Sequence, residues 1–306
     1  SSAASDVYKR QSVTLSHNKN SVKQLTGEEV QLWEANFGYS QNTHIIGINQ
    51  PLGQMYGYIT EGLYQVSDFD YDATTQTYTL KDGIPYAGDK ANVKPGMWKF
   101  KNVDGSEDNK ITEEDKTVIG NAYPKFYGGI NNTFTYKDFD LSIFLTYSFG
   151  NDVLNATKLT NTKTALQNKN VLAAADSHNR WVLVNKSGEL ITDPQEMAEI
   201  NRGKTVAAIY DNEVGDTYIH SWAVEDGSFL KLSNITLGYT FPKKIIEKIG
   251  ISKLRLYATG SNLLTWTKYS GFDPEVSTMG NGLTPGVDFG AYPKSRSFVF
   301  GINLAF

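Results

Sequence analysis

Residues 126–150 alternate apolar and polar side chains on both sides of a short turn at Lys137 and Asp138. Since successive side chains of a strand point to opposite faces, this alternation predicts an antiparallel hairpin with one apolar and one polar face. The predicted cross-strand pairs are Phe134 with Leu141, Asn132 with Ile143 and Ile130 with Leu145 on the apolar face, and Thr133 with Ser142 and Thr135 with Asp140 on the polar face. Asn132 and Phe144 are the exceptions to the pattern.

Three further segments have the same period of two. They are residues 228–241, residues 252–264 and the last ten residues, 297–306. In the last segment, large apolar side chains alternate with smaller or more polar ones: Phe298, Phe300, Ile302 and Leu304. The sequence therefore predicts at least five long strands, each with one apolar face.

The connections between these strands differ greatly in length. Residues 137–138 and 242–250 are short connections, the second a helical turn between Pro242 and Gly250, whereas residues 151–217 and 265–294 are long ones. Counting back from the last strand puts every long connection at one end of the sheet. Transmembrane β-barrels have this asymmetry, with short periplasmic turns and long extracellular loops. We expect an all-β fold, an antiparallel transmembrane β-barrel segment with long extracellular loops.

Two earlier strands complete the prediction. One ends near Asn18, and the other lies within residues 45–64, which brings the count to about seven strands. Seven strands with a truncated first member do not close a barrel, so we expect a segment of a larger one. The long connection 151–217 should also contain a short helix, capped by Asp193, begun by Pro194 and ended at Gly203.

Composition excludes several classes of protein. The formal net charge is -4 and no stripe of Lys and Arg is present, which argues against a nucleic-acid partner. The chain has no cysteine, so disulfides and thiolate chemistry are absent. No apolar run approaches the roughly 18 residues of a transmembrane helix. Aromatic residues make up 12% of the chain, which suits strands but would equally suit a soluble β-sandwich.

One acidic stretch, DGSEDNKITEED at residues 104–115, has the spacing of a calcium loop. Oxygen ligands on alternate residues can wrap one hard cation, and the ligating positions would be Asp104, Ser106, Asp108, Lys110 through its carbonyl, Thr112 and Asp115. Ile111 would be the apolar anchor. Asn109 replaces the usual glycine and Asp115 the usual glutamate, so a solvated acidic loop without metal remains the alternative.

No catalytic site is predicted. Glu113 and Glu114 are neighbours on a loop, where their side chains should diverge, and no phosphate-binding loop or nucleophile elbow is present. The four histidines lack metal-ligand spacing and are expected on the surface or in turns: His17, His44, His178 and His220. Trp266 and Tyr269, near the outer end of a strand, could stack on a sugar ring or belong to an interfacial aromatic belt.

The first residues, SSAASDVYKRQ, have neither the apolar core of a signal peptide nor the period of a strand. DVYKRQ resembles a translated transposase end from library preparation. We expect residues 1–11 to be a non-native sequencing artefact that makes no packing contacts on which the rest of the chain depends, and residues 12–306 to be the native part.

Several stretches resemble the SusC-like, or RagA-type, TonB-dependent outer-membrane transporters of Bacteroidetes. They include PLGQMYGY, FYGGINNTFTYKDFDLSIFLTYSFGNDVLN, EDGSFLKLSNITLGYTFPKK, LRLYATGSNLLTWTKYSGFDPEV and GVDFGAYPKSRSFVFGINLAF, and they occur in the family's order. The resemblance implies that residues 12–306 are the C-terminal part of a 22-stranded barrel, without its plug domain. It also implies that the terminal Phe306 belongs to a signal read by the outer-membrane assembly machinery.

The function implied by this resemblance is energised uptake of oligosaccharide or peptide, with no enzymatic activity. The implied partners are a SusD-like surface lipoprotein, TonB through an N-terminal region missing here, and outer-membrane lipid. A different class remains open: a secreted, calcium-stabilised, β-rich module that binds glycans without a membrane.

Overall fold

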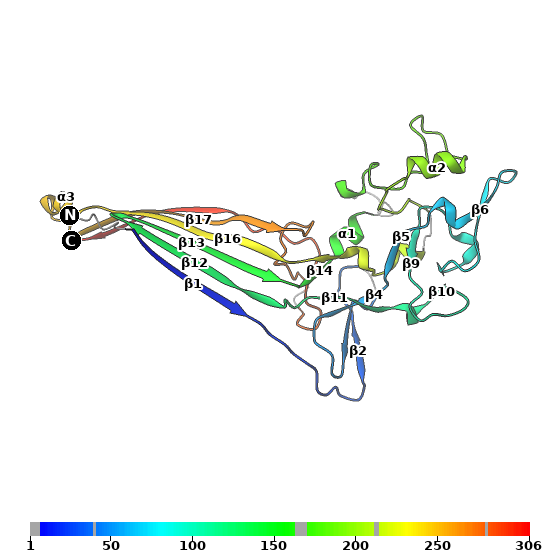
Figure 1. Ribbon diagram of the computed structural model, residues 1–306, viewed down its shortest axis with the longest axis horizontal. Coiled ribbons are helices and arrows are strands. Elements are labelled where there is room, and N and C mark those ends of the chain that lie inside the picture. The colour runs from blue at the N-terminus through cyan, green and yellow to red at the C-terminus, as the bar shows by residue number, and fades with distance from the viewer. Residues whose placement is uncertain (1–6, 39–40, 163–169, 211–213, 279–280) are drawn as a thin grey trace.

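The long strands lie side by side in one antiparallel sheet that ends in a group of smaller elements (Figure 1). The computed structural model describes residues 7–38, 41–162, 170–210, 214–278 and 281–306 of the chain. The six strands follow the order β1-β12-β13-β16-β17-β19. Their bounds are β1 Val7–Ser16, β12 Phe126–Tyr136, β13 Phe139–Phe149, β16 Phe229–Thr240, β17 Lys253–Thr267 and β19 Ser297–Ala305.

The register between β12 and β13 confirms the predicted hairpin. All five predicted pairs occur, from Ile130 opposite Leu145 to Thr135 opposite Asp140. The turn needs a left-handed residue, and Lys137 takes that conformation with φ of 51°. Phe144, the exception on the polar face, packs against Gly129. Its ring would lie 3.0 Å from a Cβ added to that glycine.

Cross-strand pairing carries the apolar face across the whole sheet. Leu141 lies opposite Leu237, which lies opposite Ala258, which in turn lies opposite Phe300. This face remains open, since Leu237 is 52% exposed and Phe300 is 80% exposed. A continuous exposed apolar surface of this kind requires an apolar partner or environment.

The opposite face is polar and has an ion pair that spans three strands. Arg255 on β17 donates two hydrogen bonds to Asp140 on β13, at 2.9 and 2.6 Å. The pair crosses Gly238 on β16, where an added Cβ would come within 2.4 Å of the guanidinium. Gly238 is therefore required for this bidentate contact.

The sheet has short turns at one end and all of its long connections at the other (Figure 1). The first end holds the start of β1, the end of β19 and the predicted turn, formed by α3 Lys243–Ile246 and the 3-10 turn η7 Glu247–Ile249. Gly250 ends it in a left-handed conformation with φ of 76°. The predicted asymmetry of the connections is confirmed.

The predicted strand within residues 45–64 is wrong. It divides into β3 His44–Gly47, β4 Gln54–Gly57 and β5 Thr60–Leu63, none of which pairs with the long strands. Left-handed conformations at Asn49 and Gly53 interrupt the run. Together with β2 Val30–Trp33 and β11 Thr117–Asn121, β3 and β4 form a sheet of order β11-β4-β3-β2.

The remaining elements are short and lie in the long connections. The strands are β6 Phe69–Asp72, β7 Thr77–Leu80, β8 Tyr86–Ala87, β9 Trp98–Phe100, β10 Lys110–Ile111, β14 Asp152–Asn155, β15 Val224–Asp226 and β18 Val287–Asp288. The helices are α1 Ala156–Asn161 and α2 Pro194–Ile200, with 3-10 turns η1 Val66–Asp68, η2 Lys90–Asn92, η3 Glu113–Asp115, η4 Ala173–Ala175, η5 Val214–Thr217 and η6 Ser221–Ala223. Within the described ranges, no helix is both long and apolar enough to cross a membrane.

Buried apolar side chains gather in these connections and not in the long sheet. One cluster packs Tyr58, Trp98, Phe100 and Trp181 together with Met197 of α2. The predicted helix α2 is confirmed at its start, since Asp193 accepts a hydrogen bond from the Gln195 amide and Pro194 is its first residue, but it ends at Ile200 and not at Gly203. Two other clusters of buried residues also lie outside the six long strands.

Residues 7–11 pair with β12 and so contact the sheet; that the rest of the chain does not depend on them stays a prediction, and residues 1–6 lie outside the described residues. The hydrogen bonds of a β-sheet join backbone atoms and do not depend on a particular side chain. The side chains of residues 7–11 break the alternation of apolar and polar faces. Lys9 lies opposite Phe134 and Gln11 opposite Asn132, both on the apolar face, whereas Val13 and Leu15 continue it. The foreign origin of residues 1–11 stays a prediction.

We predict that replacing Lys9 and Gln11 together with leucine stabilises the chain in detergent micelles. Removing one charge from an apolar strand face should raise the free energy of unfolding by about 2 kcal/mol. Urea unfolding in micelles measures the effect. The control is Arg10→Leu with Ser12→Leu on the opposite face of the same strand, and equal stabilisation by both pairs would contradict the assignment of faces.

Candidate functional site

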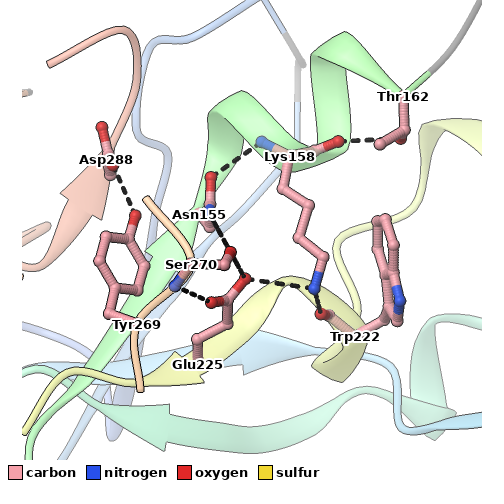
Figure 2. Close-up of polar contacts among 8 residues, drawn as sticks. All are labelled: Asn155, Lys158, Thr162, Trp222, Glu225, Tyr269, Ser270 and Asp288. Atoms are coloured by element: carbon pink, nitrogen blue, oxygen red, sulfur yellow. Dashed lines mark hydrogen bonds and ion pairs between the residues drawn. The ribbon is translucent and has the colours of Figure 1, made fainter. Parts of the chain in front are cut away.

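A mostly buried polar network joins two of the long connections where they meet at the end of the sheet. Asn155 caps α1, Lys158 lies within α1, Glu225 belongs to β15 and Ser270 follows β17. Figure 2 shows these side chains converging on the carboxylate of Glu225. Two long connections, between β13 and β16 and between β17 and β19, therefore share one set of hydrogen bonds.

Glu225 is the centre of this network. Its carboxylate accepts hydrogen bonds from the amide and the hydroxyl of Ser270, both at 2.8 Å, and from the Asn155 side chain at 3.3 Å. Lys158 forms an ion pair with it at 3.2 Å, and both side chains are less than one fifth exposed. The Lys158 ammonium also lies 4.1 Å from the ring centroid of Trp222 and donates to the carbonyl of that residue.

The protonation of Glu225 depends on these partners. Burial by itself would raise the pKa of Glu225, but the hydrogen bonds from Ser270 and the ion pair with Lys158 outweigh it. The pKa is consequently lowered from its ordinary value of 4.5, and the charged form is favoured. The network can fix the connections in place.

Tyr269 belongs to the same region and cannot stack on a sugar ring. Its side chain is 5% exposed, and its hydroxyl donates to Asp288 at 2.5 Å. Burial, together with this hydrogen bond, raises the pKa of Tyr269 well above its ordinary value. Trp266 is instead 52% exposed and lies opposite Leu230 on the apolar face, and its place in an aromatic belt stays a prediction.

Two histidines are buried, contrary to the prediction for them. His44 is 1% exposed; its Nε2 donates to the carbonyl of Pro285 and its Nδ1 pairs with the hydroxyl of Thr43. Burial lowers the pKa of His44 to about 4, so the ring is neutral at pH 7. His220 is 2% exposed and packs among aromatic rings, whereas His17 and His178 are exposed as expected.

A second ionic group attaches the connection between β17 and β19 to the sheet. Lys231 of β16 is 4% exposed and contacts Glu275 at 2.6 Å, while Lys294 contacts the same carboxylate oxygen at 2.8 Å. Neither this group nor the Glu225 network was found from the sequence. The residues of each group come from segments that are far apart in the sequence, and only the fold brings these segments together.

The predicted calcium loop has part of the expected backbone geometry. Asn109 is left-handed with φ of 55°, and Ile111 is 3% exposed as the expected anchor. Asp104 and Asp108 each accept a hydrogen bond from the amide two residues later, from Ser106 and Lys110 respectively. Thr112 caps the 3-10 turn η3.

Asp115 occupies a different place. It is fully buried, and its carboxylate accepts hydrogen bonds from the amides of Val103, Asp104 and Thr112. In the described parts of the chain, no group of three or more His, Asp or Glu side chains is gathered so that it could hold a metal ion. Asp115 thus closes the loop by itself in this conformation, and calcium binding stays a prediction.

No protein-family model matches the chain. It is 30% identical over 298 residues to TonB-dependent receptor P3 of Formosa agariphila, an alignment that covers 95% of this chain and 26% of that protein. It is 29% identical over 317 residues to TonB-dependent receptor P39 of the same species, covering 96% of this chain and 28% of that one. It is 28% identical over 206 residues to TonB-dependent receptor SusC of Bacteroides thetaiotaomicron, with coverages of 67% and 17%.

Solved structures show the same fold. The RagAB peptide importer in its open-open state has a TM-score of 0.65 at 20% identity, covering 99% of this chain and 27% of that chain. A structure of the RagAB peptide transporter gives a TM-score of 0.65 at 21% identity, with coverages of 98% and 27%. The chain spans about a quarter of the length of the TonB-dependent receptors P3 and P39. All of them are named as receptors or transporters, which agrees with the expectation of no enzymatic activity.

We predict that Glu225→Gln destabilises the connections by about 3 kcal/mol, because it leaves Lys158 partly buried without its counter-ion. Urea unfolding followed by tryptophan fluorescence measures this loss. Because the folded-state pKa is lowered, the contribution of Glu225 is complete above pH 4.5 and is lost as the pH falls below that value. The difference from the unchanged chain should shrink over the same range, and exposed Glu61→Gln should show neither effect.

We also predict that the loop from Asp104 to Asp115 binds calcium with a dissociation constant on the order of 0.1 to 1 mM. Calorimetric titration of the whole chain measures the binding. Asp104→Ala or Asp108→Ala should weaken it by removing a ligand, whereas Glu107→Ala removes the same charge from a non-ligating position. Absence of calcium uptake at millimolar concentration, or an equal effect of Glu107→Ala, would establish the solvated-loop alternative.

Proposed function

Because this chain belongs to the TonB-dependent receptors of the SusC and RagA kind, we propose that it forms part of the outer-membrane barrel of a nutrient importer. The six long strands would be consecutive barrel strands from the C-terminal part of the whole protein. The apolar face would contact lipid, and the polar face would line the interior. The long connections would then lie outside the cell.

The observation that carries this proposal is the difference between the two faces of the sheet. The apolar face from Leu141 to Phe300 is exposed across several strands, while the opposite face holds the Asp140 and Arg255 pair. Water on both sides of such a sheet would leave a large apolar surface uncovered. Lipid outside and a polar lumen inside satisfy both faces at once.

The partners follow from the same family. SusC and RagAB support a SusD-like surface lipoprotein on the extracellular side, with oligosaccharide or peptide as cargo. TonB would act through a part of the protein outside the residues of this chain. The Glu225 network would keep the connections in a fixed arrangement against which such a lipoprotein could dock.

The alternative is a secreted, calcium-stabilised module that binds glycans. It would share the aromatic composition and the acidic loop at Asp104. It gives no reason for the apolar side chains that remain exposed on β16, β17 and β19. The two proposals differ most simply in whether that face is covered by lipid.

We predict that cysteines on the two faces of β16 react differently in lipid vesicles. The chain has no cysteine of its own, so Asn234→Cys and Leu237→Cys each provide a single site. A hydrophilic maleimide should label Asn234→Cys on the polar face at least tenfold faster than Leu237→Cys on the lipid-facing one. Mass spectrometry measures both rates.

Unfolding both variants in urea is the control, since the two rates should then become equal. Ser187→Cys in a long connection and Asp138→Cys at a short turn test orientation in intact cells. The maleimide should reach Ser187→Cys and fail to reach Asp138→Cys. A chain that stays soluble without detergent and is labelled equally at Asn234→Cys and Leu237→Cys would support the secreted module.

A further inference from the structure

A basic cavity of about 620 Å³ lies where β1 ends and β12 begins. Its wall includes Lys19, Lys23, Lys125 and His17, together with four asparagines, and no Asp or Glu lines it. This local charge stands against the formal net charge of -4 for the whole chain. Over the described parts of the chain, none of the three lysines forms an ion pair.

Hydrogen bonds between distant segments build the wall of this cavity. The side-chain oxygen of Asn20 accepts from the Leu52 amide at 2.7 Å, and Asn121 donates to the Leu52 carbonyl at 3.2 Å. The amide of Val22 donates to the Gln50 carbonyl at 3.0 Å. The three lysines are therefore carried on segments that are fixed relative to one another.

Among the described acidic groups with a shifted pKa, Asp152 is the one that a lysine of the cavity influences. Lys125 lowers the pKa of Asp152, although burial dominates and the net shift of that carboxyl is upward. Asp152 does not line the cavity. A small anion of high charge inside the cavity would lie among three lysines and four asparagines with no carboxylate in the lining, which is an environment that favours phosphate.

The cavity also adjoins the apolar face of the sheet. His17 packs against Phe126 with ring centroids 5.3 Å apart, and its Nδ1 donates to the carbonyl of Lys125. Phe126 and its cross-strand partner Phe149 are 45% and 48% exposed at the end of that face. A ligand with a phosphate in the cavity could extend a hydrocarbon chain along these rings.

We propose that this cavity binds a phosphate group, carried by the headgroup of a membrane lipid. Lys19, Lys23 and Lys125 hold the phosphate, while the exposed rings at Phe126 and Phe149 contact the first part of the acyl chains. The lipid half of this assignment rests on the proposed membrane location of the sheet. The phosphate half rests only on the cavity.

The test measures binding of the whole chain in neutral detergent to dioctanoyl phosphatidic acid and to inorganic phosphate by calorimetric titration. Replacing Lys19, Lys23 and Lys125 with glutamine should weaken phosphatidic acid binding at least tenfold, since each lysine contributes roughly fivefold. The matched control replaces Lys101, Lys186 and Lys248 with glutamine. It changes the net charge equally, and its affinity should change less than twofold.

Asn20→Asp provides a second variant that keeps all the lysines. Its carboxylate still accepts from the Leu52 amide, so the wall should stay intact, as an unchanged unfolding midpoint would verify. The new charge should repel phosphate and weaken binding of both probes. Equal binding by the chain, the lysine triple variant and Asn20→Asp would overturn the proposal.

The two probes separate the sources of the phosphate. Tight binding of phosphatidic acid with weak binding of inorganic phosphate supports a lipid headgroup, whereas equal affinities overturn the lipid assignment and leave a free phosphate site. Flotation with neutral phosphatidylcholine vesicles tests the proposed function independently. If the unchanged chain does not float with these vesicles, the membrane location is contradicted. If the triple lysine variant also loses phosphate binding, the phosphate site is supported.

Discussion

Register between neighbouring strands is the constraint on which the rest of the structure depends. The period of a strand is two, so a slip of one residue would exchange the two faces of the sheet. The pairing of Leu141 with Leu237 and of Leu256 with Ile302 keeps most of the large apolar side chains on one face, with Phe144 as an exception. The register of β16 shifts near Leu232, both with β13 and with β17. Beyond this shift the strands still lead into the long connections.

The sheet could be predicted from the sequence because the alternation of side chains that specifies each strand lies within a short segment. The turn at Lys137 and the alternation around it fix a hairpin without reference to any other segment, and the pairs of β12 with β13 followed. Residues 45–64 show where this reasoning ends. They contain apolar residues at strand-like spacing, yet left-handed residues at Asn49 and Gly53 divide them into strands that pair elsewhere.

The candidate sites depended on contacts that no local pattern contains. Glu225 and Ser270 are 45 residues apart, and His44 and Pro285 are 241 residues apart. The residues that flank either member of these pairs in the sequence do not indicate the contact. The acidic loop was visible because its spacing is local, but the burial of Asp115 against three backbone amides was not, since spacing cannot distinguish a metal ligand from an acceptor that closes the loop.

The buried clusters divide the molecule into two regions, the long connections with their own buried cores and the long sheet without one. Trp98, Phe100 and Trp181 pack in the connections, whereas the long strands have few buried neighbours and rely on their surroundings. Regions with separate cores commonly open as separate cooperative units. The loop assembly should therefore behave as a foldon of its own, with slow amide hydrogen exchange that does not depend on the solvent facing the strands. Such a unit could retain its shape while the sheet beneath it is being inserted or assembled.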